Sequence, residues 1–133
     1  MSVSLSDFRI DTVVAVTDLD AAREFYGEVL GLDEVGEVSD AGMTFSCGER
    51  TNLYVYPSPD RAGKSSATMA FWSVPDLDKV IDALTARGVK MEQYNQDGLD
   101  QDDRGIHTLG GSRVAWFCDP DGNTFAIEGP LLD

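Results

Sequence analysis

The sequence predicts an α+β protein made of two tandem copies of one strand–helix–three-strand unit, written βαβββ. The main observation is an internal repeat: Val16-Thr17-Asp18-Leu19-Asp20 returns 58 positions later as Val74-Pro75-Asp76-Leu77-Asp78. A repeat of this kind indicates a duplicated structural unit. In addition, each copy begins an amphipathic helix that ends at a glycine, and β-rich segments surround both helices in the same order.

The length of 133 residues fits one compact domain, which we expect to span 1–133. Within it we place a first module at 7–57, a linker at 58–66 and a second module at 67–130. The linker is rich in Pro, Ser and Gly, as flexible connections are. Each module alone would have roughly 55–65 residues and marginal stability, so the two modules should share one core.

The first module should begin with a strand at Phe8–Ala15 and continue into a helix that ends at Leu30-Gly31. Asp18 can accept hydrogen bonds from the first-turn amides of this helix, and Gly31 can take the left-handed conformation that ends it. Apolar side chains three and four positions apart give the helix one buried stripe. The remaining strands are expected at Glu34–Val38, Met43–Cys47 and Leu53–Tyr56, with a turn at Gly48–Asn52.

The second module repeats this order from a strand at Ala67–Ser73. Its helix should be capped by Asp76 and should end at Arg87-Gly88. Asp119–Asn123 has the composition of a tight turn, because Pro fixes φ and Gly accepts a positive φ. The remaining strands are expected at Lys90–Tyr94, Arg113–Cys118 and Thr124–Glu128.

One long irregular segment, Asn95–Gly111, interrupts the second module. Loops of this length inside a compact domain are usually functional or disordered. We consider two interpretations, a lid over the mouth of a pocket and a solvated loop without a function.

The excess of acidic over basic residues limits the kinds of molecule that the protein can bind. Ten Lys and Arg stand against 24 Asp and Glu, which gives a formal net charge of −14. Such a surface repels phosphate backbones and anionic lipids, so we expect neither nucleic acid nor membrane partners. Its role is either solubility or the attraction of a cationic ligand.

The two cysteines, Cys47 and Cys118, are too few for a disulfide framework, and no CxxC pair suggests zinc. Free thiols in a reducing compartment are the ordinary case. No apolar run reaches the length of a membrane span, and no signal peptide is recognisable. We therefore expect a cytoplasmic protein.

The repeat, together with its flanking motifs, resembles the vicinal oxygen chelate superfamily, also called the glyoxalase/bleomycin-resistance/extradiol-dioxygenase superfamily. The resemblance covers nearly the whole chain and implies that the tandem βαβββ modules form a cupped mixed sheet. It does not specify an activity, because the superfamily includes enzymes as well as drug-binding proteins without activity. The motifs that carry it are Phe25-Tyr26, Val29–Leu32, Arg87–Val89 and Trp116–Asn123, besides the two repeat segments.

The resemblance also implies where a metal ion would bind, since the metal enzymes of this family carry His or Glu ligands on the first and last strands of each half. The corresponding positions hold Asp11, Tyr54, Met69 and Ala126. Only Asp11 is a suitable ligand for a hard divalent ion, and one carboxylate does not hold such an ion tightly. We therefore expect no metal at the usual site and no other cofactor.

A displaced metal site is the alternative. Glu128 lies two residues beyond Ala126, and with Asp11 and His107, the only histidine, it would make a set of two carboxylates and one imidazole. The protein would then be a metal-dependent lyase or dioxygenase of the same superfamily. In the opposite interpretation, the carboxylates lie at a pocket rim and His107 is a surface residue.

Strand alternation predicts which side chains face the cup. Residues of the other parity, such as Val14, Trp72 and Phe125, should pack beneath the helices, whereas Trp116 fits either the cup wall or the core. The cup is either open to a ligand or filled by side chains. The predicted ligand-binding residues are Asp11, Tyr54, Tyr56, Met69, Phe71, Trp116, Ala126 and Glu128.

The predicted function is the binding of a small hydrophobic or aromatic molecule in this cup, without metal. Whether the protein is also an enzyme stays open. A lyase, isomerase or dioxygenase activity without metal would need a base, for which Asp11 and Glu128 are the candidates. The family builds its cups within one chain or between two, so a homodimer is one expected arrangement.

Overall fold

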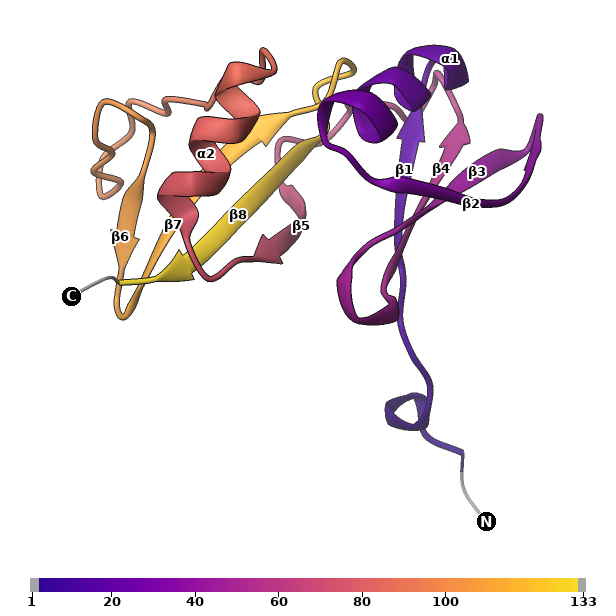
Figure 1. The fold of residues 1–133 in the computed structure, drawn as a ribbon, viewed down its shortest axis with the longest axis horizontal. Helices are drawn as coiled ribbons and strands as arrows, with labels where there is room; N and C mark the ends of the chain where they lie inside the picture. Colours follow the sequence, from indigo (N-terminus) through magenta and orange to yellow (C-terminus); the bar gives the residue numbers. More distant parts are fainter. Residues whose placement is uncertain (1–2, 132–133) are drawn as a thin grey trace. The chain divides into compact units, whose positions relative to one another are not determined.

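The computed structural model describes residues 3–131, and the ends of the expected domain, 1–2 and 132–133, lie outside this range. The chain separates into two compact units that divide between Pro59 and Asp60. Each unit contains a strand, a helix and three further strands in that order, as the repeat predicts (Figure 1). Each has one four-stranded mixed sheet.

Unit 1 begins with a short 3₁₀ turn, η1, and its helix continues from an α-helical first turn, α1, into a π-helical segment, η2. Its strand order is β1-β4-β3-β2, with β1 parallel to β4. The bounds are η1 Leu5–Asp7, β1 Thr12–Val16, α1 Leu19–Ala22, η2 Arg23–Val29, β2 Asp33–Ser39, β3 Gly42–Ser46, η3 Gly48–Arg50 and β4 Asn52–Pro57.

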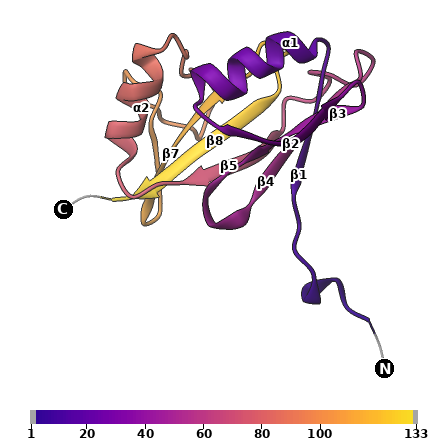
Figure 2. The ribbon, with the colours of Figure 1, turned by 45° about the vertical axis from the view of Figure 1, so that its right-hand side comes forward.

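Unit 2 has the equivalent strand order β5-β8-β7-β6, with β5 parallel to β8. Its helix α2 lies over one face of this sheet, as both views of the ribbon show (Figures 1 and 2). The bounds are β5 Thr68–Ser73, α2 Leu77–Ala86, β6 His107–Leu109, β7 Ser112–Cys118 and β8 Thr124–Pro130.

Both helices begin and end as the sequence predicts. The Asp18 carboxylate accepts a hydrogen bond from the Asp20 amide at 2.8 Å, and Asp76 accepts one from the Lys79 amide at 3.2 Å. These contacts satisfy amides that have no partner inside the helix. After the helices, Gly31 and Gly88 have φ values of 79° and 94°, a conformation that only glycine adopts without strain.

Each core lies between the helix and one face of its sheet. In unit 1, Val14, Val55 and Phe45 are fully buried, and the Phe45 ring lies 5.9 Å from that of Tyr26 in the helix. In unit 2, Phe117, Phe125 and Ile127 are buried at the equivalent positions. The predicted helix-side parity is therefore confirmed for both sheets.

The turn between β7 and β8 is held by one buried side chain. Asp119 is 5% exposed, and its Oδ1 accepts hydrogen bonds from the amides of Asp121 and Asn123 at 3.0 and 2.8 Å. Its Oδ2 accepts from the Asn123 side-chain amide at 2.8 Å, while Gly122 takes the predicted positive φ of 91°. Asn123 in turn accepts the Gly63 amide at 3.0 Å, which ties the start of unit 2 to this turn.

Two predicted strands differ from the structure, one in its start and one in its existence. The strand expected at Phe8–Ala15 begins only at Thr12, because β4 offers no partner before Asn52 and the preceding chain runs away from the sheet (Figures 1 and 2). The strand expected at Lys90–Tyr94 is reduced to one bridge between Met91 and Phe117.

The fourth strand of sheet 2 lies instead inside the predicted irregular segment, as β6. The cause is the side chain of Gln101, which accepts the Tyr94 amide at 2.7 Å and donates to the Glu92 carbonyl at 2.9 Å. Backbone groups that a side chain satisfies no longer need a strand partner. His107–Leu109 then pairs with the start of β7.

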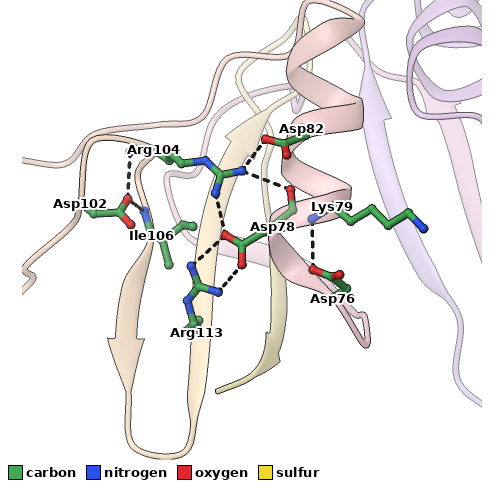
Figure 3. A network of polar contacts seen from close by, with 8 residues as sticks. All are labelled: Asp76, Asp78, Lys79, Asp82, Asp102, Arg104, Ile106 and Arg113. Carbon is green, nitrogen blue, oxygen red and sulfur yellow. Dashed lines mark hydrogen bonds and ion pairs between the residues drawn. The ribbon is translucent and has the colours of Figure 1, made fainter. Parts of the chain in front are cut away.

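The irregular segment is fastened to α2 and β7 by a network of charges (Figure 3). Asp78, on α2, is within 2.6 Å of Arg104 and within 2.8 Å of Arg113, and Arg104 also contacts Asp82 at 2.6 Å. Asp102 accepts the amides of Arg104 and Ile106, at 2.8 and 3.0 Å. The part of the segment from 101 to 107 is therefore held against α2 and β7, and whether it also covers a pocket stays a prediction.

Asp78 should make the stability of the fold depend on acid pH. Hydrogen bonds from Arg113, followed by those from Arg104, lower the pKa of Asp78 from 3.8 to about 2. A lowered folded-state pKa adds stability that is complete above the unfolded pKa and is lost as the pH falls through the folded one. Asp78→Asn should therefore lower the urea midpoint at pH 7, by an amount that shrinks between pH 4 and pH 2.

The control is Asp97→Asn, which makes the same charge change at an exposed position outside the network. Urea unfolding followed by circular dichroism at several pH values measures both variants. Equal pH dependence in the two variants would contradict a stabilising role for the network.

Asp119→Ala should destabilise unit 2 by about 2–4 kcal/mol, because it removes the acceptor from two buried donors and one part-buried donor at once. Asp119→Asn keeps one acceptor oxygen and should lose less. Thermal and urea unfolding compare the two variants, and an alanine variant as stable as the wild type would show that the turn folds without this carboxylate.

Candidate functional site

In each unit, the sheet face opposite the helix carries the side chains that sequence alternation placed toward a cup. In unit 1, Val13 pairs with Tyr54 and Ala15 pairs with Tyr56 across β1 and β4. Val13 is 49% exposed, and both tyrosines are half-buried. This face is thus an apolar, partly accessible surface.

Tyr54, at one expected ligand position, has its hydroxyl engaged within the unit. Its Oη donates to the Ala41 carbonyl at 3.0 Å. Gly42 leaves the space for the ring, since a Cβ there would lie 2.6 Å from the Tyr54 Oη. The β2–β3 turn therefore holds this phenol in place.

Asp11, the single carboxylate among the expected ligand positions, precedes β1 and forms an ion pair with Arg9 at 2.6 Å. Arg9 also donates to the backbone carbonyl of Arg50, in the turn before β4. The positive charge beside Asp11 competes with a cation for the same carboxylate.

In unit 2, the uncovered face is organised in rows of residues across the strands. One row runs Phe71–Ala126–Trp116, and the next runs Ser73–Glu128–Val114–His107. Trp116 therefore belongs to the uncovered face, which decides between the two places that its sequence context allowed. Phe71 is 63% exposed, whereas Ala126 between the two aromatic residues is 4% exposed.

Glu128 carries the charge of this face. Its Oε1 accepts a hydrogen bond from the Ser73 hydroxyl at 2.6 Å. His107 lies in the same row, but Val114 separates it from Glu128, so the two backbones are about 10 Å apart. The His107 Nδ1 contacts the Asp100 carbonyl at 2.8 Å, which fixes the ring toward the irregular segment.

A cluster that no sequence pattern indicated lies beside Trp116 and consists of Tyr94, Cys118 and Thr124. The Tyr94 ring packs edge-on against Trp116, with 5.6 Å between ring centroids. Cys118 Sγ lies 3.6 Å from Thr124 Oγ1, across β7 and β8. Desolvation by burial raises the pKa of both the Tyr94 phenol and the Cys118 thiol, so both groups are protonated at neutral pH.

Met69 departs from simple alternation. The β5–β8 register shifts between Thr68 and Ala70, so that Thr68, and not Met69, is the partner of Thr124. Met69 is the additional residue of this bulge and is 40% exposed. Its thioether is a soft group, unlike the carboxylate or imidazole that a hard divalent ion requires.

The residues present do not fit a metal ion. Between residues 3 and 131, no group of three or more His, Cys, Asp or Glu side chains is arranged to hold one. The displaced set of Asp11, Glu128 and His107 is not among such groups. Of the four positions where the family places ligands, only Asp11 offers a charged oxygen, and Arg9 already neutralises it.

A separate groove of about 570 Å³ lies on the helix side of unit 2, between α2 and the irregular segment. Its walls include Ile81, Val89 and Met91 together with Arg104, which the Asp78 network holds. No pattern in the sequence indicates this groove, because it depends on where the irregular segment packs.

Within residues 3–131, no helix has the length and apolar character needed to cross a membrane.

Comparison with known proteins gives a consistent fold. A search among curated proteins finds no match, whereas many solved structures match. A glyoxalase family protein from Bacillus anthracis superposes with a TM-score of 0.72 at 22% identity, over 93% of this chain and 96% of that one. TnmS3, an antibiotic-binding protein from Streptomyces sp. CB03234, gives 0.65 at 21% identity, over 93% and 98% of the two chains.

FosX, a genomically encoded fosfomycin resistance protein from Listeria monocytogenes, gives a TM-score of 0.67 at 15% identity, over 94% of each chain. At these identities the structures establish the fold alone. The sequence itself matches a family model over residues 9–127, which is nearly the whole chain. This chain therefore belongs to the Glyoxalase/Bleomycin resistance protein/Dioxygenase superfamily.

Proposed function

We propose that this protein binds a small aromatic or apolar molecule on the uncovered faces of its sheets, and that it does so without a metal ion. The observation that carries the proposal is the chemistry of the four ligand positions of the family. They hold a paired aspartate, an engaged phenol, a thioether and a methyl group, in place of a set of His and Glu side chains.

The surroundings of these positions support binding of an apolar ligand. Val13, Met69 and Phe71 lie on or beside these faces and are 49%, 40% and 63% exposed. Covering such apolar side chains with a ligand would be favourable, because it removes them from water. Partly exposed aromatic and aliphatic side chains with a few polar groups are typical of small-molecule sites. Glu128 and Ser73 supply the polar groups in unit 2.

The relatives give the proposal a precedent. TnmS3 is described as an antibiotic-binding protein and FosX as a fosfomycin resistance protein. Both descriptions connect proteins of this fold with small molecules.

Catalysis by the groups on these faces has less support than binding. The Cys118 thiol is protonated at neutral pH because burial raises its pKa, so it is a poor nucleophile. The two candidate bases, Asp11 and Glu128, already have partners in Arg9 and Ser73.

We further infer that the protein acts in the cytoplasm and forms a homodimer. Neither Cys47 nor Cys118 forms a disulfide in the described structure, which suits a reducing compartment. The exposed apolar residues on the sheet faces and on the chain before β1 support self-association. Size-exclusion chromatography with light scattering measures the oligomeric state.

Phe71→Ala should weaken ligand binding about tenfold or more, because it removes an exposed aromatic side chain from the proposed site. The matched control is Phe8→Ala, since Phe8 is 62% exposed but precedes β1, outside both sheets. A thermal-shift screen of drug-like aromatic compounds, followed by calorimetry, supplies the ligand. If neither the screen nor native mass spectrometry finds any ligand, the proposed function fails.

Metal reconstitution tests the metal-free part of the proposal. After incubation with Fe²⁺, Ni²⁺, Mn²⁺ or Zn²⁺ and gel filtration, elemental analysis should find much less than one ion per chain. One carboxylate paired with arginine cannot compete with water for these ions. One retained ion per chain that disappears in Asp11→Ala would support instead a metal-dependent lyase or dioxygenase with a displaced site.

A further inference from the structure

The dipeptide Asp-Gly occurs twice in the chain, at Asp97-Gly98 and at Asp121-Gly122. We infer that Asp97 is a site of spontaneous modification, at which aspartate isomerises to isoaspartate, whereas the structure protects Asp121 from the same reaction. This inference does not depend on the proposed function. It rests on how the structure holds the two peptide bonds, because the reacting pair of residues is the same at both sites.

The reaction needs only the chain itself and water. The backbone nitrogen of the glycine attacks Cγ of the preceding aspartate, whose carboxyl is in its protonated form. An N–Cγ bond forms, a Cγ–O bond breaks, and the amide hydrogen and the carboxyl OH leave as one water molecule. Water then opens the succinimide ring at either carbonyl. Opening at Cγ restores aspartate, and opening at the backbone carbonyl gives isoaspartate, in which the main chain runs through the former side chain.

Two structural conditions control how fast the ring closes. The glycine nitrogen has to be available as a nucleophile, and the peptide bond between the two residues has to rotate until this nitrogen reaches Cγ. Glycine favours the closure because no Cβ stands beside its nitrogen and its backbone has the widest conformational freedom. A hydrogen bond from the glycine amide, or close packing against the peptide carbonyl, opposes it.

At Asp97 neither condition is opposed. Asp97 and Gly98 are both exposed, and among residues 3–131 the Gly98 amide has no hydrogen-bond partner. The turn is closed by the Leu99 amide, which donates to the Gln96 carbonyl at 3.2 Å. Exposed turns with few buried contacts open at a low cost in free energy. The Asp97–Gly98 peptide bond can therefore rotate without disturbing the core.

At Asp121 both conditions are opposed. The Gly122 amide donates to the Asp119 carbonyl at 3.0 Å, so the attacking nitrogen is already engaged. The Asp121 amide donates to Oδ1 of the buried Asp119 side chain, also at 3.0 Å. Gly63 packs so closely that a Cβ on it would lie 1.9 Å from the Asp121 carbonyl oxygen. Rotation of the Asp121–Gly122 peptide bond therefore requires the turn between β7 and β8 to open.

The base of the loop around Asp97 is fixed by Gln101. This side chain accepts the Tyr94 amide and donates to the Gly105 carbonyl, both at 2.7 Å. Isoaspartate adds one methylene group to the backbone inside the loop that these contacts close. We expect the modified protein to keep its fold, so that the product accumulates in folded protein.

Ageing the folded full chain for several weeks in neutral buffer at body temperature tests the inference. Trypsin separates the two sites, because peptide 91–104 contains Asp97 and the peptide that begins at residue 114 contains Asp121. Isoaspartate gives a second chromatographic peak of unchanged mass, which an Asp-specific endoprotease no longer cuts at that residue. We expect at least about tenfold more isoaspartate at Asp97 than at Asp121, because the second site must open before it reacts.

Two controls accompany the aged wild type. Asp97→Glu keeps the negative charge, but its longer side chain does not close a succinimide ring, so the additional peak of peptide 91–104 should disappear. In guanidinium chloride the turn that protects Asp121 is lost, and the two sites should then react at similar rates. Circular dichroism before and after ageing confirms that the protein without denaturant stays folded.

Three results would overturn the inference. The first is a folded protein without isoaspartate at Asp97, since the loop would then protect this site. The second is as much isoaspartate at Asp121 as at Asp97 in the folded protein, because the turn would then give no protection. The third is an additional peak that persists in Asp97→Glu, which would place the modification at another residue of the peptide.

Discussion

The structure depends on the fact that each four-stranded sheet has one helix to cover it. A sheet gains stability when one face leaves water, and α1 or α2 provides that cover for Val14 and Val55, or for Phe125 and Ile127. Among residues 3–131, no helix covers the opposite face within either unit. Because successive side chains of a strand point to opposite faces, the choice of buried residues also determines which residues lie on that face. They include Tyr54, Phe71 and Glu128.

This alternation explains why so much of the site could be predicted from the sequence. Val13, Tyr54, Phe71 and Ala126 lie on the expected faces because a strand has a period of two and the repeat fixes its phase. The caps at Asp18 and Asp76 and the turn at Asp119–Asn123 were equally predictable, since each requires only neighbouring residues.

The predictions failed where distant groups compete for the backbone. Gln101 takes the hydrogen bonds of Glu92 and Tyr94, and β6 consequently forms from His107–Leu109 in place of the expected strand. No pattern in the sequence joins residues that are seven or nine positions apart in an irregular segment. The bulge at Met69 and the position of Tyr94 against Trp116 escaped for the same reason.

The Asp78 network also shows how two copies of one unit can diverge. Asp20 and Asp78 occupy the same place in the repeat, but only Asp78 holds two arginines, and one of these, Arg104, belongs to the segment between α2 and β6. In unit 1 the helix leads almost directly into β2. Shortening the second connection to that length in an engineered protein would remove Arg104 and leave Asp78 to Arg113 alone. The insertion therefore carries one half of its own anchor, Arg104, whereas the acceptor Asp78 belongs to the helix of the duplicated unit.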